Sequence, residues 1–218
     1  MNIKLIYFNF AFWRAEISRI SLFHAGIEFE DVRISSEDFA YIKANGTLPD
    51  GTPIPTKALP CLTVNGVSIC QTGAIARYCG KLSGLYPKDD DLACASIDQI
   101  LDTCTDLTNA LSFPPNIETE SDRKSFRKSL LLPDGKLTKY FSALNLLHKN
   151  YNTTVKSLLS PTQFTVADLA IWGIVRWFKS GLIDYIPDNL SDLYPDLILT
   201  HDKISKNKTV LEWLLKTK

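Results

Sequence analysis

The sequence has no long hydrophobic run and no excess of either charge. No window approaches the roughly 20 consecutive apolar residues that a membrane-spanning helix needs, so we expect no membrane span. The N-terminus has no basic segment followed by an apolar stretch and a cleavage site, and we therefore expect a cytoplasmic protein. The 24 basic residues balance the 24 acidic residues, so the total charge gives no reason to expect a nucleic-acid partner or an anionic membrane surface.

Cysteine and histidine patterns that bind metals are also missing. The five cysteines form an odd set without a C-x-x-C pair, and the three histidines are scattered. We therefore interpret the cysteines as small hydrophobic residues of a reduced chain, and we expect no metal site and no bound cofactor. Because no cysteine lies at the start of the first predicted helix, a thioredoxin-like disulfide exchanger is disfavoured.

What the sequence does contain is two halves with different periodicities. The first half alternates in the order β-α-β-α-β-β-α, with strands predicted at residues 3–8, 29–34, 59–64 and 67–70 and helices at 14–25, 36–44 and 73–82. From Leu92 onward only helical spacing persists, in segments that include 97–111, 121–151 with a break at 133–135, 166–180, 190–203 and 208–216. We expect an α/β domain over 1–82, a linker over 83–91 and an all-helical domain over 92–218.

Residues 58–77 carry the first indication of function. Two short apolar runs flank Asn65-Gly66, which is a strong signal for a two-residue hairpin. Pro60 heads the first run, where a proline is compatible with a strand start or a sheet edge. Thr72 is expected to cap the following helix, whose first backbone N–H groups can bind an anion. Together these features predict a site for a small peptide-like molecule with a carboxylate.

Two further helix starts are marked by residues with short polar side chains. Ser36 is expected to cap the helix over 36–44. Thr165 followed by Asp168 predicts a capping box at the start of the helix over 166–180.

These motifs, in their order and separation, resemble the cytosolic glutathione transferases. The matching segments are Lys4–Asn9 with Arg14-Ala15-Glu16, then Leu59-Pro60, Gln71–Tyr78, Asp98–Asp106 and Phe164–Leu169. The likeness is greatest to the sigma class, which includes the glutathione-dependent prostaglandin D synthases. It implies a thioredoxin-like N-terminal domain with the order β-α-β-α-β-β-α, followed by an all-α C-terminal domain. Leu59-Pro60 resembles the cis-proline element of the family.

The resemblance implies catalysis by Tyr7. A thiol with a pKa of about 8.5 is mostly protonated at neutral pH, and a hydroxyl that donates a hydrogen bond to the sulfur favours the thiolate. Arg14 resembles the arginine that polarises this tyrosine. The alternative to a catalytic role is that Tyr7 only packs in the sheet. The alternative for Arg14 is that it is an exposed arginine at a helix start. Six residues, Phe8 to Trp13, separate Tyr7 from Arg14, one more than is usual in the family, and the glycine that often precedes the arginine is missing.

The same resemblance implies a binding residue for each part of glutathione. Leu59, before Pro60, would bind the cysteinyl backbone as a strand edge binds an extended peptide, and Gln71 and Thr72 would bind the γ-glutamyl group. The other implied contacts are to the glycyl end from Phe39, Lys43 and Lys57, and from a neighbouring subunit through Asp106.

The resemblance also implies a homodimer and a pocket for a hydrophobic electrophile. Asp102 and Asp106 share one helix face and favour a symmetric interface, whereas Asp98 is equally consistent with a solvated acidic stripe. No interface metal is expected, since Thr105 stands where a carboxylate ligand would be needed. The pocket walls would comprise Phe10, Phe12, Trp13, Leu101, Cys104 and Thr105.

Three functions stay open on this basis. The first is a glutathione transferase with glutathione as co-substrate. The second is an isomerase such as a prostaglandin D synthase, which would use the same first site. The third is a non-catalytic carrier or structural relative of the same fold.

Overall fold

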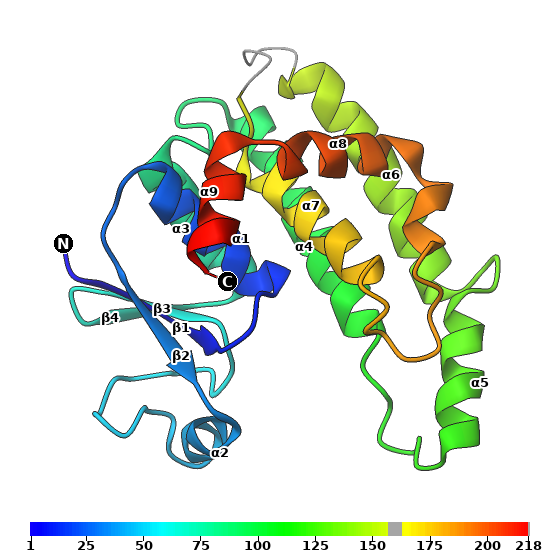
Figure 1. Ribbon diagram of the computed structural model, residues 1–218, viewed down its shortest axis with the longest axis horizontal. Coiled ribbons are helices and arrows are strands. Elements are labelled where there is room, and N and C mark those ends of the chain that lie inside the picture. Colours follow the sequence, from blue (N-terminus) through cyan, green and yellow to red (C-terminus); the bar gives the residue numbers. More distant parts are fainter. Residues whose placement is uncertain (157–162, 218) are drawn as a thin grey trace. The chain divides into compact units, whose positions relative to one another are not determined.

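The computed structural model describes residues 1–156 and 163–217 and divides into two compact units (Figure 1). Unit 1 comprises residues 1–88 together with the chain from Lys208 onward, and unit 2 comprises residues 89–207. Unit 1 has the predicted order β-α-β-α-β-β-α, so the thioredoxin-like fold class is confirmed. Its elements are β1 (Ile3–Phe8), α1 (Trp13–His24), β2 (Glu30–Ile34), α2 (Ser36–Asn45), β3 (Cys61–Val64), β4 (Val67–Cys70), α3 (Thr72–Ser83) and, from the end of the chain, α9 (Lys208–Lys216).

The four strands form one sheet in the order β2-β1-β3-β4. β1 pairs with β2 in parallel and with β3 in antiparallel, as a βαβ unit followed by a hairpin requires. Alternate residues of β1 are buried on opposite faces. Leu5 packs in a cluster with residues of α1 and α3, and Ile6 packs with Ile42 of α2 and residues of the following loop. The central strand is therefore buried on both faces, and its carboxyl end, at Tyr7, is held rigidly.

The β3–β4 hairpin has the predicted two-residue turn. Asn65 and Gly66 both have positive φ angles, 49° and 86°, as a type I′ turn requires. The register that follows pairs Val64 with Val67 and, at the far end, Cys61 with Cys70. The turn thus sets which side chains face each other beside Pro60 and Gln71.

The structure corrects two of the three predicted caps. α2 is capped by Ser35, not Ser36, because the Ser35 hydroxyl accepts a hydrogen bond from the N–H of Asp38 and the Asp38 carboxylate accepts one from the N–H of Ser35. Thr72 does not cap α3; it is the first helical residue, and Gln71 occupies the cap position without a side-chain hydrogen bond. The Thr165–Asp168 capping box of α7 is confirmed.

All regular secondary structure in the described residues of unit 2 is helical. Its α-helices are α4 (Asp91–Ala110), α5 (Glu120–Leu130), α6 (Lys136–Thr154), α7 (Val166–Phe178) and α8 (Pro195–Ser205), and a 3₁₀ helix spans Leu190–Leu193. The predicted break at residues 133–135 separates α5 from α6. Nearly every residue of α7 is buried, and this helix is the centre of the unit. Within the described ranges, no helix is long and apolar enough to span a membrane.

The C-terminal helix differs from the expected domain boundaries. The sequence places residues 208–218 in the helical domain, but α9 groups with the sheet in unit 1. The physical reason is its buried face. Trp213 lies 5.5 Å from the ring of Phe23 in α1, and its Nε1 donates a 2.8 Å hydrogen bond to the buried carboxylate of Glu16. An indole N–H satisfies a buried carboxylate oxygen that would otherwise lack a partner.

Replacing Trp213 by phenylalanine should therefore lower the free energy of unfolding by about 1–3 kcal/mol, since Oε2 of Glu16 loses its buried donor. Chemical denaturation followed by circular dichroism measures this change. Leu215→Ala, at an exposed position of the same helix, is the control and should change stability by no more than about 0.5 kcal/mol. Equal losses in the two variants would show that the Glu16 contact contributes nothing specific.

Candidate functional site

Tyr7 lies at the carboxyl end of β1, where the chain leaves the sheet. It pairs with Arg33 of β2, and its side chain is only 4% exposed. The rings of Phe8 and Phe10 contact it edge-on, with centroids 5.4 and 5.8 Å away. Apolar rings thus pack against the Tyr7 ring near the end of the strand.

Burial determines the protonation state of Tyr7. It raises the pKa of the phenol to about 12, and the positive charges of Arg14 and Arg19 partly oppose this rise. At neutral pH the phenol therefore keeps its proton and is a hydrogen-bond donor, not a base. A buried neutral donor beside two cations is suited to stabilising a negative charge that binds next to it.

Arg14 lies at the start of α1, close to both Tyr7 and the start of α3. Its Nη1 donates a 3.3 Å hydrogen bond to Oγ1 of Thr72, and its guanidinium lies 5.4 Å from the ring of Trp13. Burial lowers the pKa of Arg14, and the neighbouring Tyr7 opposes that change. The six-residue connection therefore leaves Arg14 next to Tyr7. The Thr72 hydroxyl thus accepts a hydrogen bond from α1, while Gln71 holds the cap position of α3.

The segment between Tyr7 and Arg14 is a run of mutually contacting rings. Phe8 stacks on Phe10 at 5.6 Å, and Phe10 contacts Phe12 edge-on at 6.1 Å. Phe10 is 51% exposed, whereas Trp13 is buried as the first residue of α1. Of the three aromatic residues expected to line the second pocket, Phe10 thus presents the largest apolar surface, and Trp13 is part of the core.

The Leu59-Pro60 bond is cis, as the resemblance implies. Pro60 is buried and Leu59 is half-buried at the approach to β3. Across the hairpin, Gln71 is exposed with a φ angle of 77° and precedes α3. The first N–H groups of an α-helix have no partner within the helix, so the start of α3 offers donors beside an exposed glutamine and the Thr72 hydroxyl.

α2 and the loop after it hold the three residues predicted for the glycyl end. Nζ of Lys43 lies 5.4 Å from the ring of Phe39, and Phe39 contacts Phe8 at 4.9 Å. Lys57 has a different partner: its ammonium donates a 2.9 Å hydrogen bond to the carbonyl oxygen of Ala44 near the end of α2. Phe39 and Lys43 thus lie near the end of β1, whereas Lys57 is hydrogen-bonded to α2.

Arg19 is a further functional candidate, which no motif in the sequence predicts. Its side chain is fully buried behind Tyr7, with the guanidinium carbon 5.9 Å from the phenol ring. It bonds the carboxylates of Glu16 and Asp31 at 2.8 and 3.0 Å, and the carbonyl of Phe10 at 3.4 Å. The sequence signal for this buried ion pair is the spacing of Glu16 and Arg19, three residues apart on the otherwise apolar face of the helix.

Comparisons with known proteins decide the family. Residues 3–81 match the profile of the glutathione S-transferase N-terminal domain. Glutathione S-transferase 3 of Caenorhabditis elegans is 32% identical, over 99% of this chain and 97% of that protein. The chain belongs to the glutathione S-transferase family. A hematopoietic prostaglandin D synthase of Gallus gallus is also 32% identical, over 99% of this chain and 96% of that protein.

The fold agrees with solved structures of the family. A structure titled prostaglandin synthase D of Nilaparvata lugens has a TM-score of 0.76 and 27% sequence identity, and the match covers 99% of this chain and 98% of that chain. The resemblance to glutathione transferases and the two-part fold class are therefore confirmed.

The residues of α4 that the family resemblance selects lie in unit 2. Leu101 and Cys104 are fully buried, so their side chains present no surface to a ligand, contrary to the expected pocket wall. The reason is helical spacing, since these two positions belong to the face of α4 that forms the core of the unit. Thr105 is half-buried and its hydroxyl donates to the carbonyl of Leu101, while Asp106 and Asp102 are exposed.

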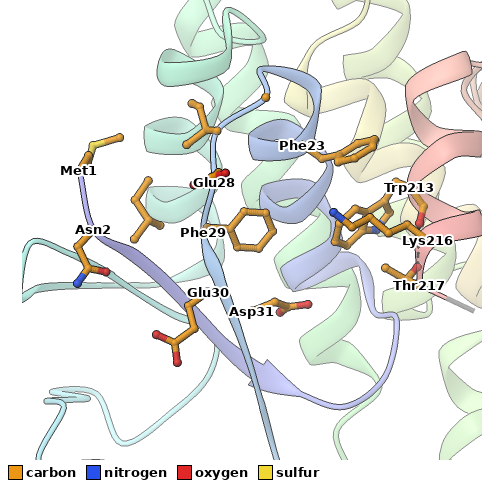
Figure 2. A pocket seen from close by; sticks show the side chains of 13 residues that line it. Met1, Asn2, Phe23, Glu28, Phe29, Glu30, Asp31, Trp213, Lys216 and Thr217 are labelled. Carbon is orange, nitrogen blue, oxygen red and sulfur yellow. Dashed lines mark hydrogen bonds between the residues drawn. The ribbon is translucent and has the colours of Figure 1, made fainter.

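A hollow of about 810 Å³ lies elsewhere in unit 1 of this family member (Figure 2). It is near the amino end of β1, between the end of α1 and α9, and the rings of Phe23, Phe29 and Trp213 face it. None of the predicted glutathione or catalytic residues lines it. This hollow is therefore distinct from the surroundings of Tyr7.

Proposed function

We propose that this family member is a glutathione transferase of the sigma type, in which Tyr7 activates the glutathione thiol. The Tyr7 hydroxyl donates a hydrogen bond to the sulfur and favours the thiolate. The thiolate attacks an electrophilic carbon of a hydrophobic substrate, the leaving group departs with the bonding electrons, and the thiol proton passes to solvent. The observation that carries the proposal is a buried, protonated Tyr7 hydroxyl with Arg14 beside it.

The binding part of the proposal assigns each part of glutathione to unit 1. The backbone N–H and C=O of Leu59 bind the cysteinyl residue, and the cis bond to Pro60 shapes that edge. Gln71, Thr72 and the start of α3 bind the γ-glutamyl carboxylate and ammonium. Phe39 and Lys43 bind the glycyl end, with Lys57 as a secondary contact, since its ammonium already has a partner.

The direct test has two steps. Native protein should be retained on immobilised glutathione and eluted by free glutathione, and it should conjugate glutathione to a generic aryl halide. Absence of retention would reject the binding site. Retention without turnover would reject catalysis and favour the carrier.

The pH profile should show the contribution of Arg14. Its charge lowers the pKa of Tyr7, and by the same physics it should lower the pKa of a thiol bound there. At saturating glutathione, kcat/KM for the aryl halide should rise with pH as the bound thiol loses its proton. In Arg14→Met we expect the midpoint of this rise to move up by about one pH unit, equivalent to about 1.4 kcal/mol. Activity would then fall most at neutral pH and recover at alkaline pH. A pH-independent loss would contradict an electrostatic role, and Lys81→Met, on the exposed end of α3, is the matched control for loss of a positive charge.

An isomerase is the second candidate, and the relatives named prostaglandin D synthase favour it. Both reactions use the same activated thiol, so the second substrate distinguishes them. In unit 1, the exposed surfaces of Phe10 and Phe12 are proposed to contact the hydrophobic second substrate. A panel of aryl halides, hydroperoxides and prostaglandin H-type endoperoxides, compared by kcat/KM, separates conjugation from reduction and isomerisation.

We also propose a homodimer in the cytoplasm. Asp102 and Asp106 are exposed on one face of α4 and are assigned to the subunit interface, where Asp106 would reach the glutathione of the neighbouring subunit. Sedimentation equilibrium should give twice the mass of the chain. A monomer that retains full activity would contradict the assignment of Asp106.

A further inference from the structure

Cys61 and Cys70 face each other across the β3–β4 hairpin. They are register partners at the end of the ladder, and Sγ of Cys70 donates a hydrogen bond to Sγ of Cys61 at 3.7 Å. Cys61 directly follows Pro60, and Cys70 directly precedes Gln71. The two thiols are therefore adjacent in sequence to the two segments assigned to glutathione, Leu59-Pro60 and Gln71-Thr72.

The hairpin turn determines the kind of pair that these cysteines form. With a two-residue type I′ turn, Val64 and Val67 are a hydrogen-bonded pair, and hydrogen-bonded and non-hydrogen-bonded pairs alternate along the ladder. Three steps further, Cys61 and Cys70 are a non-hydrogen-bonded pair. Such pairs have Cα atoms about 4.5 Å apart, within the range of about 4.4–6.8 Å that a disulfide bridges.

The two thiols have different environments, which suits a two-step exchange. Cys70 is half-buried, whereas Cys61 is fully buried and burial raises its pKa to about 12. Thiol–disulfide exchange starts with the accessible thiol and ends with attack by its neighbour. Cys70 is thus placed to react with a small disulfide from solution, and Cys61 to resolve the product.

We propose that Cys61 and Cys70 form a thiol–disulfide exchange site that is oxidised by glutathione disulfide. The Cys70 thiolate, its proton lost to solvent, attacks one sulfur of glutathione disulfide, the S–S bond breaks, and one glutathione leaves and takes up a proton. Cys61 then loses its proton and attacks Sγ of Cys70, and the second glutathione leaves. The protein loses two hydrogens and glutathione disulfide gains two.

The choice of glutathione disulfide as oxidant rests on the proposed function, whereas the pairing of the thiols does not. Reduced, desalted full-length protein is incubated with glutathione disulfide, unfolded in N-ethylmaleimide and analysed by intact mass and peptide mapping. Maleimide adducts should fall from five, one for each cysteine, to three, with a peptide cross-link between Cys61 and Cys70. Five adducts, or a stable glutathione adduct on Cys70 beside an alkylated Cys61, would overturn the proposal.

Three variants define the chemistry. Cys61→Ala should stop at a glutathione adduct on Cys70, Cys70→Ser should form neither adduct nor bridge at these positions, and Cys94→Ser, at another half-buried cysteine, should form the bridge as the native chain does. Loss of the bridge in Cys94→Ser, or a disulfide at Cys61 in Cys70→Ser, would refute the assigned pair. Should Cys61→Ala fail to fold, the native protein and Cys70→Ser alone decide the outcome.

A separate measurement keeps the two proposals apart. Retention of the reduced native protein on immobilised glutathione tests the proposed function and does not involve the bridge. Hydroxyethyl disulfide, which lacks the glutamyl and glycyl groups, should oxidise the pair at least tenfold more slowly than glutathione disulfide does. Equal rates would overturn the part of the inference that gives glutathione disulfide a preferred role.

Discussion

Tyr7→Phe is expected to lower kcat/KM for conjugation of glutathione to an aryl halide by about 10²–10³-fold, the usual effect of removing one donor from a developing or bound anion. The ring is retained, so the apolar contacts with Phe8 and Phe10 persist and the fold is preserved. Because the phenol of the native protein is protonated at neutral pH, the variant loses a donor and not a base. Steady-state kinetics at saturating glutathione measure the effect.

The matched control is Tyr78→Phe. Tyr78 is half-buried in α3, and its hydroxyl contacts the sulfur of Met1, at the far end of β1 from Tyr7. Removing this hydroxyl should leave kcat/KM within about twofold of the native value, since exposed polar contacts of this kind contribute little. If Tyr7→Phe and Tyr78→Phe had the same kcat/KM as the native protein, Tyr7 would not be the activating residue.

Asp168→Ala should cause the largest loss of stability, about 3–5 kcal/mol, as expected when one partner of a buried ion pair is removed. The carboxylate is fully buried at the start of α7. It accepts hydrogen bonds of 2.9 Å from the N–H of Thr165 and from the hydroxyl of Tyr151, and it forms an ion pair with Lys156. Its removal leaves the Thr165 N–H and the Lys156 ammonium without this acceptor and removes one of the two partners of the Tyr151 hydroxyl. Urea denaturation measures the change in the free energy of unfolding.

Asp122→Ala tests the same motif without burial. Asp122 forms a capping box with Thr119 at the start of α5, but at an exposed position. Its loss should cost about 1 kcal/mol, typical of a helix cap. The difference between the two variants isolates the contribution of burial, and similar losses at Asp122 and Asp168 would contradict the central role of the Asp168 network.

The fold could be predicted from local patterns because both units contain short-range signals. The alternation of apolar residues in β1, the Asn65-Gly66 turn and the Thr165–Asp168 box each specify a local conformation, and the structure agrees at each. Cap choices are less certain from sequence. Ser35 and Ser36 are both serines, and only the distance to Asp38 decides between them.

The remaining features depend on contacts between residues far apart in sequence. The Thr72 hydroxyl accepts a hydrogen bond from Arg14, 58 residues earlier in the chain. α9 joins unit 1 because Trp213 finds Glu16, 197 residues away. Arg19 gains its place behind Tyr7 only when β2 brings Asp31 beside α1. Local periodicity carries no information on such pairings, which is why residues on motifs could be proposed for the site from the sequence and Arg19 could not.

Titration of bound glutathione tests the central claim most directly. The ultraviolet absorbance of the thiolate is followed against pH in the saturated complex of the native protein and of Tyr7→Phe. The account predicts a thiol pKa at least one unit below the free value of about 8.5 in the native complex, and a return toward the free value in the variant. A native complex in which the thiol titrates as it does in free glutathione would contradict activation by Tyr7.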